Sequence, residues 1–172
     1  MLGGVVLNPG QAGVRNLGLT PSHVYALWVN INDSLIEVAR VVSDDISRRE
    51  TILSTPPKSF EGKMPSDVFD SVMRRRRMLE RLGSSFPIAG HLAEIGSNNV
   101  EHELVTPSDV FVNSGQILDG LVVWLIQNTD TKQRISGSYT CRKIHDKTPN
   151  DVFGLVDPAN RRLEIILSKL VT

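Results

Sequence analysis

The sequence predicts an all-α protein: a four-helix bundle built from four sequence repeats of about 42 residues, with long irregular connections. Two observations predict this fold class. A six-residue motif recurs four times, and the residues after each copy place apolar side chains three and four positions apart, as one face of a helix does. The copies begin at Thr20, Met64, Thr106 and Thr148, so their starts lie 44, 42 and 42 residues apart.

Each copy of the motif, with the consensus Thr-Pro-Ser-Asp-Val-Phe, has the composition of a helix start. Thr is a good N-cap residue, Pro is tolerated at the first helical position, and Asp near the third position suits the positive end of the helix dipole. We therefore expect Thr20, Thr106 and Thr148 to be N-caps.

The residues after each motif predict an amphipathic helix of about 18–22 residues. Counted from the first motif residue, offset 4 is always Val and offset 15 is always Leu. These positions predict two buried layers, formed by Val24, Val68, Val110 and Val152 and by Leu35, Leu79, Leu121 and Leu163. Offsets 8, 11 and 18 are mostly apolar, and together these spacings form one stripe on each helix.

Four similar apolar stripes are most economically buried against one another in a closed bundle. The alternative is a solenoid of helix pairs, because a period near 42 residues also occurs in such arrays. The connections (about 41–63, 83–105 and 128–147) are rich in turn residues, and Ile88–Ile95 is expected to form a short helix. Connections of this length do not determine which helices are antiparallel. Pro158 is expected to kink the fourth helix or make it restart after Asp157.

The domain organisation predicted is an irregular N-terminal arm, residues 1–19, followed by a single four-helix-bundle domain, residues 20–172. The first and third repeats resemble each other at offsets 13 and 16, and so do the second and fourth. Duplicated halves, 20–105 and 106–172, are one interpretation of this alternation.

Composition excludes several classes of function. The formal net charge is zero, from 19 basic and 19 acidic residues, so no overall field favours nucleic acid. No apolar run approaches 18 residues, so no membrane span is expected. The arm lacks the features of a signal peptide, which is compatible with the cytoplasm, or with the periplasm if a signal peptide has been removed.

The run Arg74–Arg77 is the strongest local charge. Arg75 occupies an offset that is filled by apolar residues in the other repeats, so its burial requires a carboxylate, a snorkelling head or an anionic ligand. We consider Arg75 and Arg76 candidate ligands for an anionic group. The alternative is a solvated helix face with internal salt bridges.

Trp28 and Trp124 fall on the apolar stripes, where core packing is the simplest explanation. They are also candidates to line an apolar ligand pocket between helices. No catalytic residue, metal site or cofactor is predicted. His91, Glu94, Glu101, His102 and Glu103 have no defined metal-ligand spacing, and Cys141 lacks recognisable catalytic partners.

The sequence therefore favours a non-enzymatic binding or interaction module, of unknown specificity, over an enzyme. Its candidate partners are a second copy of the chain, another protein, or a small apolar or anionic ligand. The alternative is an enzyme or cofactor-binding protein that uses the bundle interior with an arginine-held anionic group. If Ile36, Val122 and Val123 remain uncovered, they would form an apolar strip suited to a homodimer.

Overall fold

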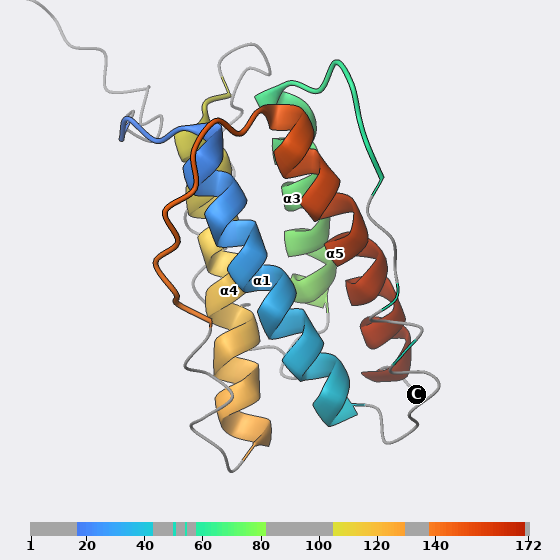
Figure 1. Cartoon of the computed structure of the whole chain (residues 1–172). Coiled ribbons are helices and arrows are strands. Elements are labelled where there is room, and N and C mark those ends of the chain that lie inside the picture. Colours follow the sequence, from blue (N-terminus) through green and yellow to red (C-terminus); the bar gives the residue numbers. More distant parts are fainter. Residues whose placement is uncertain are drawn as a thin grey trace, which may run out of the picture.

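The computed structural model describes residues 17–42, 50, 54, 58–81, 105–129 and 138–170. In these ranges the chain forms four α-helices and no β-strand: α1 (Pro21–Val42), α3 (Pro65–Arg81), α4 (Pro107–Asn128) and α5 (Pro149–Leu170). The helices pack against one another (Figure 1), so the predicted all-α, four-helix class is confirmed. Residues 88–95 and most of the arm 1–19 lie outside the described residues.

All four helices run in the same direction. The proline that opens each helix and the valine three residues later surround one small pocket, so all four N-termini lie at the same end (Figure 1). A helix of 22 residues is about 33 Å long at 1.5 Å per residue. Each connection must therefore return the chain along the full length of the bundle, which about twenty extended residues can do.

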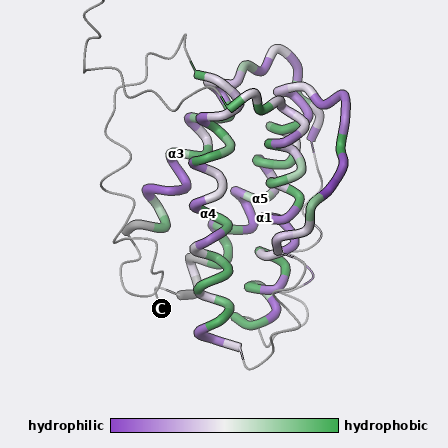
Figure 2. Tube along the Cα trace, turned by 90° about the vertical axis from the view of Figure 1, so that its left-hand side faces the viewer, coloured by the Kyte–Doolittle hydropathy of each residue, from purple (hydrophilic) through white to green (hydrophobic). Residues whose placement is uncertain are grey.

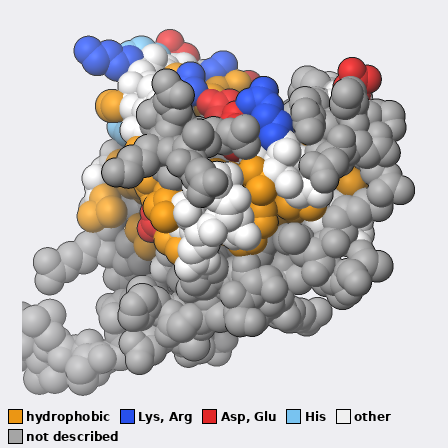
Figure 3. All heavy atoms as spheres, turned by 90° about the horizontal axis from the view of Figure 1, so that it is seen from below, with side chains coloured by type: hydrophobic (Ala, Val, Ile, Leu, Met, Phe, Trp, Pro, Cys, Tyr) orange, Lys and Arg blue, Asp and Glu red, His pale blue; other side chains and the backbone are white. Residues whose placement is uncertain are grey.

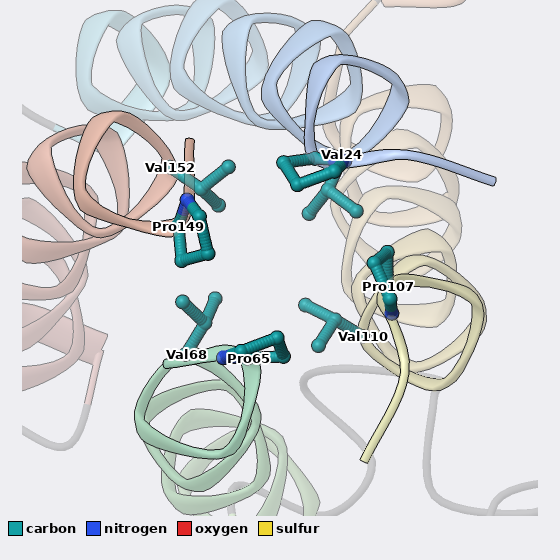
Figure 4. Close-up of a pocket in the computed structure, with 8 residues that line it drawn as sticks. Val24, Pro65, Val68, Pro107, Val110, Pro149 and Val152 are labelled. Atoms are coloured by element: carbon teal, nitrogen blue, oxygen red, sulfur yellow. The ribbon is translucent and has the colours of Figure 1, made fainter. Parts of the chain in front are cut away.

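The helices form a ring in the order α1, α4, α3, α5. α1 packs against α4 and α5, and α3 packs against the same two helices. Figure 4 shows this ring along its axis. Contact between the first and last helices excludes the solenoid, in which each repeat contacts only its neighbours along the chain.

The two predicted layers of the core are confirmed. All eight Val and Leu residues at offsets 4 and 15 are buried, with exposed fractions of at most 3%. The seam residues described at offsets 8, 11 and 18 are also buried: Trp28, Val72, Ser114 and Val156; Ile31, Arg75, Ile117 and Ala159; Val38, Trp124 and Ile166. Because the helices are parallel, residues at equal offsets are brought to similar heights in the bundle.

The helices differ in how apolar they are. Figure 2 shows hydrophobic turns along α4 and hydrophilic turns along α3. Among the described residues, α4 alone is long and apolar enough to cross a membrane, with a mean hydropathy of 1.3, but 56% of that window is buried inside the protein. Packing against α1 and α3 therefore accounts for its composition. Figure 3 shows the bundle from its opposite end, with hydrophobic side chains of the described residues near the middle of the view.

Pro158 lies inside α5, which is continuous from Pro149 to Leu170. Of the two outcomes expected at Pro158, the restart after Asp157 does not occur, and the kink stays a prediction. The residue four positions earlier, with whose carbonyl a helical proline clashes, is Gly154, and a residue without a side chain gives that turn room to adjust. Pro158 is buried, so its fixed ring contributes to packing and helps offset the lost backbone hydrogen bond.

Candidate functional site

The four motifs meet at one end of the bundle and surround a small pocket. Each helix contributes its first proline and the valine at offset 4 (Figure 4). The pocket that they line has a volume of about 10 Å³, which is room for about one water molecule. These residues therefore close the end of the core and leave no space for an organic ligand.

The aspartate of the motif caps three of the helices. Its Oδ2 accepts a hydrogen bond at 2.8 Å from the backbone N–H of Met64 at α3, of Thr106 at α4 and of Thr148 at α5. At α4 and α5 the threonine hydroxyl also accepts from the aspartate N–H, which completes a capping box. The predicted N-cap roles of Thr106 and Thr148 are confirmed.

The backbone N–H and the hydroxyl of Thr148 hold the pKa of Asp151 below its usual value. A folded-state pKa below the unfolded value means that this carboxylate stabilises the fold above about pH 4 and loses that contribution as the pH falls further. The cap of α5 is therefore stable at neutral and mildly acidic pH.

The start of α1 is different, because His23 takes the place of the aspartate there. Its Nδ1 lies 3.1 Å from the backbone nitrogen of Thr20 and 2.9 Å from the Thr20 hydroxyl. The backbone carbonyl of Thr20 accepts from the N–H groups of His23 and Val24, as expected at a helix start. The Thr20 hydroxyl, however, contacts the imidazole ring, which differs from the capping box of Thr106.

The residues before three of the motifs bind the next helix around the ring. The backbone N–H of Lys63 donates to Asn150 Oδ1 at 2.7 Å, that of Lys147 to Ser22 Oγ at 3.0 Å, and that of Leu17 to Ser108 Oγ at 3.2 Å. In each pair the acceptor is the motif residue at offset 2. This polar position therefore joins the start of one helix to the start of the next.

Two of these junctions also contain a cation–π contact. The ammonium group of Lys63 lies 4.4 Å from the centre of the Phe153 ring, and that of Lys147 lies 4.9 Å from the centre of the Tyr25 ring. Phe153 also packs edge-on against Phe60, with the ring centres 4.8 Å apart. The aromatic residue at offset 5 thus packs against the lysine that precedes the neighbouring helix.

A left-handed backbone conformation occurs two residues before three of the motifs. The φ angles are +67° at Gly18, +67° at Gly62 and +57° at Asp146. Glycine adopts this conformation without strain, and aspartate tolerates it better than most residues. The turn directs the chain onto the neighbouring helix, a role that sequence reasoning missed although the pattern Gly, Gly, Asp precedes the motifs.

Trp28 and Trp124, predicted as pocket-lining residues, are both buried in the core. The indole Nε1–H of Trp28 on α1 donates to Ser114 Oγ on α4 at 3.0 Å. Both residues occupy offset 8, so the largest side chain of this layer faces the smallest.

The structure separates the two candidate arginines. The guanidinium of Arg75 bonds to Glu164 of α5 at 2.6 Å, whereas that of Arg76, on an almost wholly buried side chain, bonds to Asn113 of α4 at 2.7 Å. Arg75 Nε is buried and has no acceptor among the described residues. Arg75 bonds to α5 and Arg76 bonds to α4. The two side chains therefore do not form one anion site.

Polar contacts of this kind occur at all four interfaces of the ring. Besides Trp28–Ser114, Arg76–Asn113 and Arg75–Glu164, the guanidinium of Arg162 on α5 donates to Asn32 Oδ1 on α1 at 2.8 Å. Since the four helices have similar apolar stripes, these different polar pairs distinguish the correct neighbours from the incorrect ones.

The segment 138–148 lies along α1 and also contacts α4. Its contacts are polar: Asn30 Nδ2 donates to the carbonyl of Thr140, Arg142 forms an ion pair with Asp33 at 2.7 Å, and Tyr139 donates to Asp119 at 2.7 Å. Partial burial and the Asp119 carboxylate raise the pKa of Tyr139 to about 12. Cys141, in the same segment, is exposed.

The exposed apolar residues on α4 are only partly the ones expected for the strip of Ile36, Val122 and Val123. Val122 is buried with an exposed fraction of 4%, so its assignment to the strip is wrong. Val123 and Ile126 on α4 are exposed, with fractions of 38% and 57%. They lie three residues apart, on one side of the helix.

The described residues contain no group of three or more His, Cys, Asp or Glu side chains that could hold a metal ion. The acidic and histidine residues considered between His91 and Glu103 lie outside the described residues. Comparisons with protein-family models, with curated proteins and with solved structures found no match.

Proposed function

We propose that the protein is a non-enzymatic interaction module that binds a second copy of its own chain through the outer face of α4. The observation that supports this proposal is the exposure of Val123 and Ile126 on one side of the most apolar helix. Neighbouring exposed apolar side chains are typical of protein interfaces. A twofold axis beside this face would bury both residues of each chain.

The contacts of the other candidate residues are consistent with this proposal. Trp28, Arg75 and Arg76 each bond to a neighbouring helix, and the pocket at the N-terminal end has room for about one water molecule. These side chains contribute to the fold, which leaves the exposed α4 residues as the described group best suited to a partner.

Light scattering and native mass spectrometry of the purified protein test the proposal. The wild type is expected to be a dimer, and the double variant V123E/I126E a folded monomer, because charges on this face oppose its burial. Ser168→Glu is the control, since Ser168 is exposed on α5, the helix opposite α4 in the ring. A wild-type monomer at all accessible concentrations would refute the proposal.

A second candidate function is binding of an anionic group by Arg75 of α3. The buried Nε of Arg75, which has no acceptor among the described residues, favours it. Titration with phosphate, sulfate or a fatty carboxylate would test it. Arg75→Leu should abolish binding and leave the fold intact, while absence of binding to the wild type would exclude this function.

We further propose that the chain arose as a fourfold repeat of about 42 residues. Equivalent roles at offsets −2, 0, 2, 3, 4 and 5 support it, since each motif position makes comparable contacts in several copies. Met64 stands where the other three motifs have Thr, and it is exposed, so its substitution can test the equivalence. Met64→Thr should complete a capping box with Asp67 and stabilise the protein by about 0.5–2 kcal/mol. A melting temperature that does not rise would argue against equivalence.

A further inference from the structure

His23 replaces a carboxylate with a titratable base at one of four equivalent helix starts. A backbone N–H can only donate, so the 3.1 Å contact with Thr20 N makes His23 Nδ1 the acceptor. The neutral ring must then carry its proton on Nε2. At α3, α4 and α5 the same backbone N–H donates to a carboxylate oxygen.

Protonation of the imidazole would remove this bond. The imidazolium ion has two N–H donors and no acceptor, so the N–H of Thr20 would lose its partner. The added positive charge would also face the positive end of α1, where the first turn contains no acidic residue to offset it. Three further helix N-termini lie at the same end of the bundle.

The charged groups on neighbouring elements do not compensate such a charge. Asp109 on α4 and Asp151 on α5 are bonded within their own caps, as is Asp67 on α3. In the segment beside α1, Lys147 lies over the ring of Tyr25, in the same turn as His23, and adds a positive charge. His145 and Asp146 precede it, and no described carboxylate bonds to His23.

We propose that His23 is a proton-sensitive cap, and that its protonation in mild acid releases the first turn of α1 while the aspartate caps of the other helices persist. Leu17, three residues before Thr20, donates to Ser108 on α4, so the release extends to this contact. Mild acid thus loosens the junction between α1 and α4.

Amide hydrogen exchange measured by NMR between pH 5 and 8, corrected for intrinsic rates, tests this inference. In the wild type, opening of the first turn of α1, read at the amides of His23 and Val24, is expected to increase on the order of fivefold at pH 5, the equilibrium factor that corresponds to one N-cap. The first turn of α3, with its Asp67 cap, is the internal reference and should not change.

Three variants separate His23 from other causes. His23→Asn, whose side-chain oxygen accepts but does not titrate in this range, and His23→Asp should both remove the pH response. His145→Gln should retain it, which excludes the neighbouring histidine. The inference is overturned if His23→Asn keeps the wild-type response, or if ¹⁵N shifts at pH 8 place the ring proton of His23 on Nδ1.

Discussion

The helices α3 and α4 begin with the same motif and contribute to the same layers, yet they are held in the bundle in different ways. α4 buries Leu118, Val122 and Leu125 in addition to its seam, whereas α3 buries Val68, Val72 and Leu79 together with Arg75 and Arg76. The hydrophobic effect is nondirectional, so burial of apolar area stabilises α4 in any arrangement that covers its apolar face. The arginines of α3 require particular partners, so they add specificity for one arrangement.

The largest expected effect compares one core layer on the two helices. Leu121→Ala on α4 and Leu79→Ala on α3 should each lose about 2–5 kcal/mol of unfolding free energy, since both leucines are fully buried. Arg77→Ala, at an exposed position of α3, is the control and should change little. Denaturant melts measure all three. A Leu79 effect as small as that of Arg77 would show that α3 is not part of the shared core.

The next comparison separates the two arginines of α3. Arg76→Leu should lose about 1–3 kcal/mol, because it leaves the partly buried amide oxygen of Asn113 without its donor. Arg75→Leu should be neutral or stabilising, because its partner Glu164 is half exposed and returns to water. Thermal melts of both variants distinguish them. Equal losses would contradict the assignment of different roles.

The N-terminal caps of α3 and α4 are expected to give a smaller difference in unfolding free energy. Thr106→Ala at α4 should lose about 0.5–2 kcal/mol, because the hydroxyl bonds with Asp109 disappear. Met64→Ala at α3 should have almost no effect, since Met64 is exposed and is joined to Asp67 through its backbone N–H. A chemical denaturation series resolves the difference, and a Met64 effect as large as that of Thr106 would be unexpected.

The smallest contrast concerns two glycines. Gly62→Ala, before α3, should lose about 1 kcal/mol, because φ is +67° although a Cβ would meet nothing within 4 Å. Gly115→Ala, inside α4, should gain about 0.5–1 kcal/mol, because a Cβ there also has free space and alanine favours a helix. Opposite signs in paired melts are the expected result, and equal signs would refute the backbone argument.

Sequence periodicity was sufficient to predict the four helix starts and the buried Val and Leu layers, because these depend on local capping and on which face of a helix is apolar. It did not exclude a restart at Pro158, where α5 is continuous, and it counted Val122 among the residues that could remain uncovered, although the neighbouring packing buries it. At both residues tertiary contacts outweighed a local preference.

The sequence by itself determined where each helix begins, which of its faces is buried and which residues share a layer. Only the tertiary structure decided that the helices are parallel, that they form the ring α1, α4, α3, α5, and that Arg75 and Arg76 reach opposite neighbours. The physical reason is that four similar apolar stripes can be buried in several arrangements with nearly equal area. Directional contacts such as Trp28–Ser114 and Lys147–Ser22 distinguish these arrangements, and they form between residues 86 and 125 positions apart in the chain.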